Sequence, residues 1–549
     1  MHFKIKTIKG RKYLYLIKNE WINKKVVQTM QKYIGTPEQV YELINSGESS
    51  HIASYPFGKP AALIKAAEEV GLIESINKHV GRKKIDGLTP AQYLLMTIIG
   101  RSEHVHSRNG LEDYFKRSVL QFFWNPKYKL SSQNFLNYMA KLDEDTIQKI
   151  ELDVSRTLVE CGLRPTRLIF DTTNFYTHIE SGDELPQKGN SKDKRFDKNL
   201  IGIGLTTSDH NIPFQSITYP ANENDSQLFS GIIDSISKRL LDIDVSAEDV
   251  VIVFDRGMNS AENIQKALEK MHVVGSLPAP MCKDLFQIPT SMYSESWKNA
   301  HGHIIKAHPV SENWYETNFN GVLRYNDHTM RKQMNSWLQN KEKIFTKIEE
   351  IQFKLGRNGK GRKLTPKGLI NRVVDAIPKQ YRSLFDYKVV TEESKLQLDF
   401  KLDEVRERDF VSSMGKKIIF TDLKGLNSRQ IAEIYDSRNQ IETDIMWLKD
   451  RLLIPLKPTY VRRDVKIRAH VFLCILGLLL YNYTLHVIND PTLTMKQLSQ
   501  YLDQMRLGLV YTGEENNKIR KRADFVIEDM NKSTAEVFTK LQLGQFIPA

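Results

Sequence analysis

The amino-acid sequence predicts an α/β protein built on a mixed β-sheet with helices packed against it. Two observations predict this class. Between residues 165 and 279, short apolar runs bounded by turn residues alternate with amphipathic, helix-like stretches. Their order is three strands, a helix, a strand, a helix and a strand, which favours a sheet with both antiparallel and parallel neighbours.

Two segments precede this core. Residues 1–57 form an expected hairpin-like segment, because apolar and polar residues alternate through 12–35 around a polar centre. Residues 58–164 form an expected, mainly helical region, because apolar residues recur at three- and four-residue spacing. Such a region serves DNA binding or dimerisation, or it only packages the chain. Its basic loop residues favour contact with phosphates: Arg101, His104, His106 and Arg108.

The first part of the core spans residues 165–279. Strands are expected at 167–173, 200–208, 212–221, 250–257 and 272–279, and helices at 226–241 and 260–271. This order of elements is that of the ribonuclease-H-like fold. We therefore expect a ribonuclease-H-like core.

The block at 280–415 departs from this alternation. It holds short strand candidates and a long helical stretch near 328–356, so we expect an α+β domain inserted into the core. Within it, residues 354–372 include seven Lys and Arg and no acidic residue. This segment is expected to be mobile or to contact phosphates, and a solvated flap is the alternative.

The core is expected to resume at residues 416–490. A strand at 416–423 precedes a long helix at 427–452, and the apolar run at 471–483 predicts a buried helix. The last residues, 491–549, form an expected helical tail.

Composition favours a protein that binds a polyanion. With 549 residues and 40% hydrophobic content, the chain can bury several cores. It carries 79 Lys and Arg against 66 Asp and Glu, a formal net charge of +13. A basic chain attracts nucleic acid through electrostatic steering and counterion release, so nucleic acid is the expected partner. A basic soluble protein without such a partner is the alternative.

Cysteine usage and hydropathy indicate a soluble intracellular protein. The three cysteines, Cys161, Cys282 and Cys474, are far apart and supply neither a disulfide framework nor a zinc site. The N-terminus has no apolar signal core. The apolar run at 471–483 is shorter than the ~20 residues that span a bilayer. We therefore expect a cytoplasmic protein without a membrane partner.

Two of the expected strands lead into an acidic residue. Asp171 follows the apolar residues 168–170, and Asp255 follows the apolar residues 250–254. Carboxylates from neighbouring strands can share Mg²⁺ or Mn²⁺ at the rim of a sheet, because these hard ions prefer oxygen ligands. Two such ions activate a water or hydroxyl and stabilise the leaving oxygen in phosphoryl transfer. The alternative is that each aspartate only caps a turn or the following helix.

The helix expected at 427–452 supplies a third carboxylate. Four residues share one face of this helix because of their spacing: Tyr435, Arg438, Glu442 and Lys449. Glu442 completes the expected metal site, whereas Arg438 and Lys449 are suited to phosphates. An exposed helix with an Arg438–Glu442 ion pair is the alternative. The competing acids of the helix lie off this face: Glu433, Asp436 and Asp444.

The spacing Tyr-x2-Arg-x3-Glu-x6-Lys resembles the signature of DDE transposases of bacterial insertion sequences, in the insertion-sequence-4 group. The motifs at 170–176 and 254–260 look like the two Asp motifs of that group. Residues 188–205 are similar to a Gly-x-Ser-Lys-Asp-x-Arg-x-Asp element of one branch, and 467–482 to the apolar helix that follows the Glu motif. The resemblance implies a ribonuclease-H-like core with an insertion before the catalytic glutamate.

The resemblance also implies the chemistry and the partners. Asp171, Asp255 and Glu442 would bind Mg²⁺ or Mn²⁺ and activate water for strand nicking, and then the freed 3′-hydroxyl for attack on target DNA. The residues expected to contact DNA are Tyr435, Arg438, Lys449, Lys192, Arg195 and Arg256. The implied partners are the double-stranded terminal inverted repeats of the element and the target DNA, bound by a homodimer in the synaptic complex.

Three tryptophans are candidates for a further DNA contact. In relatives, a Trp of the insertion stacks an extruded base and stabilises a DNA hairpin. The candidates here are Trp297, Trp314 and Trp337, although packing is the preferred role for each. We therefore infer no hairpin step.

The leading function is a DDE transposase in the bacterial cytoplasm, associated with the nucleoid when it is bound to DNA. One alternative is a domesticated DNA-binding or repressor protein that keeps the scaffold without the chemistry. The other is a ribonuclease-H-like nuclease that acts on cellular DNA. The three intact carboxylates argue against the first alternative, and the long insertion argues against the second.

Overall fold

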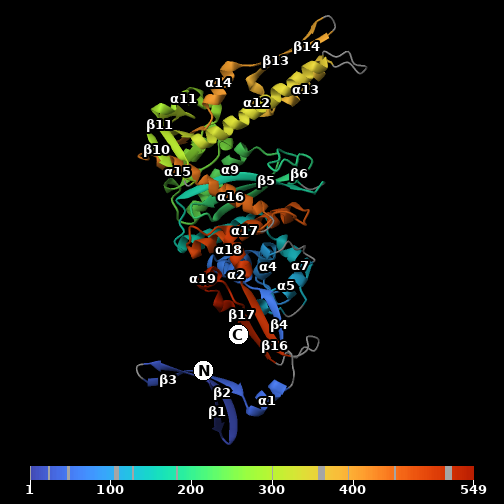
Figure 1. Cartoon of the computed structure of the whole chain (residues 1–549), viewed down its shortest axis with the longest axis vertical. Coiled ribbons are helices and arrows are strands. Elements are labelled where there is room, and N and C mark those ends of the chain that lie inside the picture. The colour runs from blue at the N-terminus through green and yellow to red at the C-terminus, as the bar shows by residue number, and fades with distance from the viewer. Residues whose placement is uncertain are drawn as a thin grey trace. The chain divides into compact units, whose positions relative to one another are not determined.

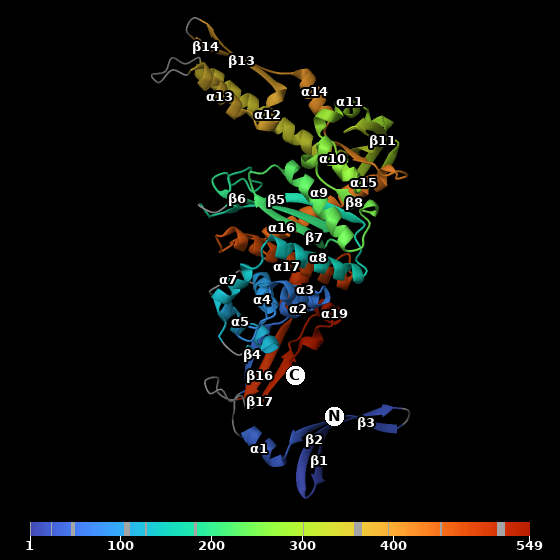
Figure 2. The same cartoon turned by 180° about the vertical axis from the view of Figure 1, so that it is seen from behind.

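The computed structural model of the chain describes residues 2–22, 25–45, 50–103, 110–126, 129–180, 184–299, 301–355, 365–392, 395–450, 453–512 and 522–548. The chain divides into two compact units. The first comprises Met1–Ala62, Glu112–Lys127 and Val487–Ala549, and the second comprises Leu63–Leu111 and Tyr128–His486. Their elements are labelled in Figures 1 and 2.

The first unit contains two three-stranded antiparallel sheets within its described residues. Its strands are β1 (His2–Ile8), β2 (Arg11–Ile22), β3 (Lys25–Gly35), β4 (Ser50–Pro56), β16 (Arg506–Thr512) and β17 (Arg522–Ile527). The hairpin expected within 12–35 is confirmed as the paired strands β2 and β3. The tail expected to be helical over 491–549 is mixed instead, because β16 pairs with both β17 and the N-terminal β4.

Four described helices fall wholly within the first unit: α1 (Pro37–Asn45), α6 (Leu120–Trp124), α18 (Met495–Gln504) and α19 (Lys532–Lys540). Three helices have residues in both units: α2 (Gly58–Glu69), α5 (Leu111–Arg117) and α17 (Asp464–Ile488). Among the described residues, α17 is the one helix long and apolar enough to cross a membrane. However, 83% of its most apolar window is buried inside the structure, so the buried helix expected at 471–483 is confirmed.

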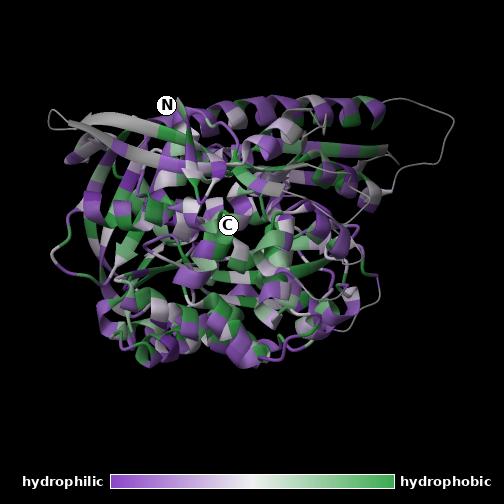
Figure 3. Ribbon diagram, turned by 90° about the horizontal axis from the view of Figure 1, so that it is seen from below, coloured by the Kyte–Doolittle hydropathy of each residue, from purple (hydrophilic) through white to green (hydrophobic). Residues whose placement is uncertain are grey.

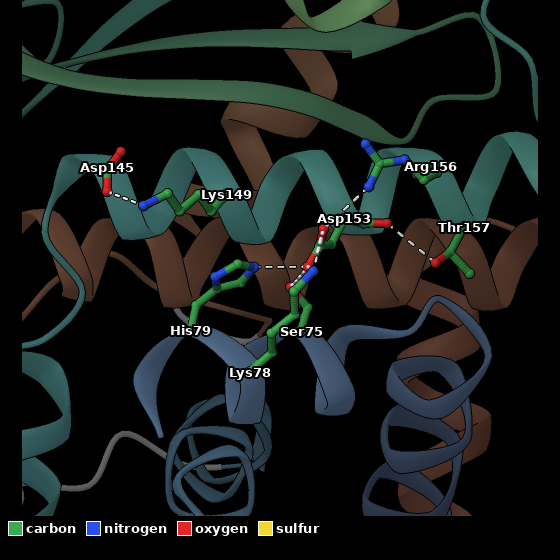
Figure 4. A network of polar contacts seen from close by, with 8 residues as sticks. All are labelled: Ser75, Lys78, His79, Asp145, Lys149, Asp153, Arg156 and Thr157. Atoms are coloured by element: carbon green, nitrogen blue, oxygen red, sulfur yellow. Dashed lines mark hydrogen bonds and ion pairs between the residues drawn. The ribbon is translucent and has the colours of Figure 1, made fainter. Parts of the chain in front are cut away.

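The helices that precede the core sheet in the second unit are α3 (Leu72–Val80), α4 (Pro90–Glu103), α7 (Ser132–Met139) and α8 (Glu144–Glu160). A polar network holds α3 against α8 around Asp153 (Figure 4). The Nζ of Lys78 lies 3.0 Å, and the Nε2 of His79 2.8 Å, from Oδ2 of Asp153. Partial burial raises the pKa of Asp153, but its hydrogen bonds to Lys78 and His79 outweigh this effect, so the pKa lies below its ordinary value.

A nine-stranded mixed sheet forms the core of the second unit, in the order β10-β11-β12-β15-β9-β8-β5-β6-β7. Its strands are β5 (Arg167–Thr177), β6 (Asn199–Ser208), β7 (Pro213–Pro220), β8 (Val251–Val253), β9 (His272–Ser276), β10 (Glu295–Lys298), β11 (Ile304–Trp314), β12 (Thr317–Asn326) and β15 (Lys416–Thr421). β5 pairs antiparallel with β6 and parallel with β8, and β8 pairs parallel with β9. The predicted class, a large mixed α/β sheet consistent with a ribonuclease-H-like fold, is confirmed.

The domain inserted between the strands of this sheet is shorter than the block 280–415 expected from the sequence. β10, β11 and β12 fall within the block 280–415 but extend the core sheet, because β12 pairs with β15. The prediction that the whole block forms a separate domain is therefore wrong for these strands. The remaining elements are α12 (Asp327–Leu355), α13 (Pro366–Ala376), β13 (Phe385–Glu392), β14 (Lys395–Leu402) and α14 (Glu404–Ser412), which share their own apolar cluster. Of the predicted basic segment at 354–372, residues 356–364 lie outside the described residues.

Helices cover both faces of the sheet. They include α9 (Asp225–Asp242), α10 (Ala261–Leu268), α15 (Ser428–Asp436) and α16 (Arg438–Lys449), and the short α11 (Lys283–Phe286) follows β9. Phe170 and Phe254 pack with Phe229 of α9 in one apolar cluster. Because successive residues of an extended chain point to opposite faces, Asp171 and Asp255 lie on the face away from α9. α9 and α16 lie on opposite sides of β5 (Figure 1).

Single helices carry both hydrophobic and hydrophilic stretches along their ribbons (Figure 3). This pattern is expected of amphipathic helices that bury one face and expose the other. It explains why helical spacing in the sequence predicted these elements well.

Candidate active site

Asp171 and Asp255 lie beside each other on adjacent central segments of the sheet. The parallel pairing of β5 with β8 ends at Ile169 and Val253, and each aspartate follows two residues later on the same face. The prediction that Asp171 ends its strand is wrong, because β5 continues to Thr177 through its pairing with β6. Only the pairing of β5 with β8 ends before Asp171.

The guanidinium of Arg438 lies between three carboxylates. Its Nη1 is 3.8 Å from Oδ2 of Asp171 and 3.8 Å from Oδ2 of Asp255. Its Nη2 donates a hydrogen bond of 2.5 Å to Oε1 of Glu442. The side chain of Arg438 is 13% exposed, whereas that of Glu442 is 50% exposed. The structure therefore brings the three predicted acids around one cation.

Electrostatics at the site favour a bound positive charge. Burial raises the pKa of the Asp171 carboxyl, and the nearby positive charges of Lys192 and Arg438 oppose this rise only in part. Burial lowers the pKa of the Arg438 guanidinium, but Tyr435 and the surrounding carboxylates outweigh it and raise that pKa overall. Clustered carboxylates of this kind are stabilised by a cation among them.

The helix expected at 427–452 divides at Ser437 into α15 and α16. Tyr435 therefore lies in a different helix from Arg438 and is buried, with its hydroxyl 2.9 Å from Oγ of Ser276 on β9. The prediction that all four signature residues share one exposed helix face is wrong for this tyrosine. Its ring still supports the site, because Cζ of Arg438 lies 5.8 Å from the ring centroid.

Two of the predicted DNA contacts make hydrogen bonds near the carboxylates. The Nζ of Lys449, at the end of α16, lies 2.9 Å from Oδ1 of Asp193. Lys457 reaches the other carboxylate oxygen of Asp193 at 3.4 Å. Lys192 donates to the carbonyl and hydroxyl oxygens of Thr172, the residue after Asp171 in the chain. Lys457 was missed from the sequence, although its place between two prolines in a basic stretch is a signal that could have identified it.

The other two predicted basic contacts, Arg195 and Arg256, are also at least partly exposed. Arg195 makes two hydrogen bonds of 2.9 Å to Asp197, and its guanidinium lies 4.8 Å from the ring centroid of Tyr176. Arg256 is exposed directly after Asp255. Both side chains are therefore accessible from solvent.

Several weaker predictions are settled by burial. Arg101 is buried and donates to the carbonyl oxygens of Pro455 and Pro458, so the prediction that it contacts phosphate is wrong. The predicted basic loop residues His104, His106 and Arg108 lie outside the described residues.

Two of the three tryptophans are buried in apolar clusters, as their preferred packing role predicted: Trp314 and Trp337. Trp297, on β10, is half-buried.

The site fits a divalent cation by its donor chemistry. Asp171, Asp255 and Glu442 offer oxygen donors, which Mg²⁺ and Mn²⁺ prefer, and a cationic group already lies among them. Within the described part of the chain, no three acidic, His or Cys side chains are close enough together to hold an ion. Arg438 stands between Glu442 and the two aspartates in this arrangement.

The strand order and the paired aspartates on adjacent central segments are those of a mixed α/β protein and are consistent with a ribonuclease-H-like fold. Residues 162–480, more than half of the chain, match the family model described as Transposase DDE domain. The chain therefore belongs to this family of transposases, which act on DNA. Among curated proteins, none matches the chain. The family favours transposition over the repressor and nuclease alternatives.

Proposed function

We propose that this transposase cuts DNA at the ends of an insertion sequence and joins the freed ends to target DNA. Asp171, Asp255 and Glu442 are the proposed ligands of Mg²⁺ or Mn²⁺. The observation that carries this proposal is the convergence of the three carboxylates on the guanidinium of Arg438. The Tyr-x2-Arg-x3-Glu-x6-Lys spacing further supports a place in the insertion-sequence-4 group.

The three proposed metal ligands differ in how firmly the fold positions them. Asp171 lies within the central strand β5, and Asp255 follows β8 by two residues, so the sheet positions the backbone of both residues before substrate binds. Glu442 is half-exposed, so it can turn toward the aspartates once Arg438 releases it. When bound, divalent ions supply Lewis acidity that activates a water or 3′-hydroxyl and stabilises the leaving oxygen.

Basic residues around the carboxylates supply the proposed DNA contacts. Arg438 and Lys449 now bind carboxylates, and a DNA phosphate offers the same charge-assisted hydrogen bonds. Lys192, Arg195 and Arg256 lie on the segments that follow the two catalytic aspartates. The proposed substrates are double-stranded terminal inverted repeats and target DNA, held by a homodimer in the synaptic complex.

The test is metal-dependent cleavage of DNA that carries the element ends. We expect nicking by the wild type in Mg²⁺ or Mn²⁺, and a loss of about 10³-fold in Asp255→Asn and Glu442→Gln, because the metal contributes several kcal/mol to the transition state. DNA binding in a gel-shift assay should stay close to that of the wild type. Equal nicking by the wild type and Asp255→Asn would contradict the proposal.

A matched control distinguishes the loss of a metal ligand from the loss of any carboxylate on these helices. Glu433 of α15 is an exposed carboxylate that pairs with Arg429 at 2.8 Å. Glu433→Gln removes the same charge as Glu442→Gln without touching the site, so it should nick like the wild type. Tight binding of the ends with no nicking by the wild type would instead favour the domesticated binding protein.

A further inference from the structure

A cleft of about 940 Å³ opens in the second unit next to α16. One wall is formed by residues 176–180, at the end of β5, and the other by residues 457–462. Lys449, the last residue of α16, also lines it. The volume is near the upper end of the ~300–1,000 Å³ range of ligand sites. The cleft is therefore large enough for a substantial ligand.

Positive charge dominates the lining of this cleft. Among the described residues that line the cleft, Lys449, Lys457 and Arg462 face one carboxylate, that of Glu180. The carboxylate of Asp193 holds the two lysines at 2.9 and 3.4 Å, which leaves an excess of positive charge around it. Such a lining suits a ligand with more than one negative charge, such as a run of phosphates.

Two tyrosines give the cleft an aromatic character as well. The ring of Tyr176 lies beneath the Nζ of Lys457, which is 3.7 Å from the ring centroid. Tyr460, on the opposite wall, is 53% exposed. Its φ of +55° lies in the left-handed region, which is disfavoured for a bulky side chain. The fold therefore holds Tyr460 in a strained backbone conformation and leaves its ring open to solvent.

The wall that carries Tyr460 is anchored from inside the protein. The buried guanidinium of Arg101 donates to the carbonyl oxygens of Pro455 and Pro458, the latter at 3.3 Å. The Nε2 of the buried His470 lies 2.8 Å from the carbonyl oxygen of Leu456. Anchoring through backbone carbonyls on both sides of Lys457 fixes the cleft before any ligand enters, which is the arrangement expected of a binding site.

We propose that the cleft binds unpaired nucleotides of a DNA strand, with a base stacked on Tyr460 and phosphates on Lys449 and Lys457. An aromatic ring stacks on the face of a base, which is covered in a duplex, so the ligand is single-stranded. Lys449 follows Glu442 by seven residues, about 10 Å along α16, so a strand in the cleft continues to the carboxylates. That this strand is the one being cleaved rests on the proposed function.

The test measures binding of a fluorescent oligothymidylate by anisotropy, on the full chain without metal, at several salt concentrations. Tyr460→Asn removes the ring with a residue that tolerates positive φ, and should weaken binding about tenfold without changing the salt dependence. Tyr460→Phe keeps the ring and should bind within about twofold of the wild type. Lys457→Gln should reduce the slope of log K against log salt by about 0.7, the value for one phosphate contact on a single strand.

A cation on the opposite side of the sheet provides the control. Lys238 is exposed on α9, so Lys238→Gln loses the same charge far from the cleft and should keep the slope of the wild type. If Tyr460→Asn binds like Tyr460→Phe, or Lys457→Gln behaves like Lys238→Gln, the cleft proposal is overturned. Because the assay contains no metal, oligonucleotide binding in the cleft is measured independently of DNA cleavage. Binding in the cleft can therefore be confirmed even if the protein does not cleave DNA, and it can be refuted even if the protein does.

Discussion

Neighbouring acids of α16 differ in role because they point in different directions. Asp444 follows Glu442 by two residues, so its side chain is rotated by about 200° around the helix. Its carboxyl is fully buried, and Oδ1 accepts hydrogen bonds from Asn482 at 3.2 Å and Gln440 at 3.4 Å. Asp444 is therefore a buried structural residue, whereas Glu442 remains half-exposed beside Arg438.

The buried Asp444 predicts a specific pH dependence of stability. Burial raises its pKa to about 7, well above that of an aspartate in the unfolded chain. As pH rises from about 4 to 7, the unfolded chain releases this proton and the folded chain keeps it, so folding loses roughly 1.4 kcal/mol per pH unit. The loss ends above pH 7, where both states are ionised.

Asp444→Asn replaces this carboxyl with a neutral group of the same shape. In urea unfolding, the variant should match the wild type near pH 4 and exceed its free energy of unfolding by about 2–4 kcal/mol at pH 8. Glu442→Gln is the control, because its carboxylate is half-exposed. A constant difference between Asp444→Asn and the wild type across this pH range would contradict the assignment.

Residue spacing predicted part of the site and missed part of it. Glu442 was preferred over Asp444 because of its helix face, and in the structure Glu442 is half-exposed beside Arg438 whereas Asp444 is buried. The burial of Tyr435 was missed because helical spacing does not register the break at Ser437, whose φ of −57° and ψ of −19° remain in the helical region. Lys457 was missed because it lies in an irregular segment without any periodicity.

At the scale of elements, a close approach between strands depends on a glycine. A Cβ at Gly275 of β9 would lie 2.7 Å from Cζ of Phe420 on the neighbouring β15 and 3.2 Å from Phe254. The ring of Phe254 is itself packed on Phe229, with centroids 4.8 Å apart. Phe254 and Phe420 are both fully buried, so a side chain at this position would force closely packed rings to shift.

Gly275→Ala should therefore lower the free energy of unfolding by about 1–3 kcal/mol, as measured by urea denaturation. The control is Gly231→Ala in α9, where no described atom lies within 4 Å of the new Cβ. This second change should be neutral or stabilise by up to ~1 kcal/mol, because alanine favours helix more than glycine does. If both variants unfold at the same urea concentration, the packing argument for Gly275 fails.

The elements themselves were easier to predict than their partners. Apolar runs located β5 to β9 because each of these strands is largely buried and is bounded by polar residues. The pairing of β12 with β15, and of β4 with β16, joins segments far apart in the chain. Local sequence patterns carry no information about such pairs. For this reason the predicted insertion was too long, and the C-terminal tail was predicted to be helical although it contains two strands.

At the scale of the whole molecule, the excess of positive charge is consistent with the DNA substrate of the family. The formal charge of +13 favours association with DNA but does not locate it. Around the site, the structure pairs several cations with carboxylates, among them Lys449 with Asp193 and Arg195 with Asp197. We propose that DNA phosphates replace these carboxylates and that the ion pairs hold the basic side chains in place until the substrate binds.

We propose that Asp171, Asp255 and Glu442 form one divalent metal site. The most direct measurement is a titration of the full chain with Mn²⁺, followed by electron paramagnetic resonance. We expect the wild type and Asp444→Asn to bind Mn²⁺ alike. Asp255→Asn and Glu442→Gln should each weaken binding at least about tenfold, because each loses an oxygen ligand. Equal Mn²⁺ affinity in all four proteins would contradict the claim.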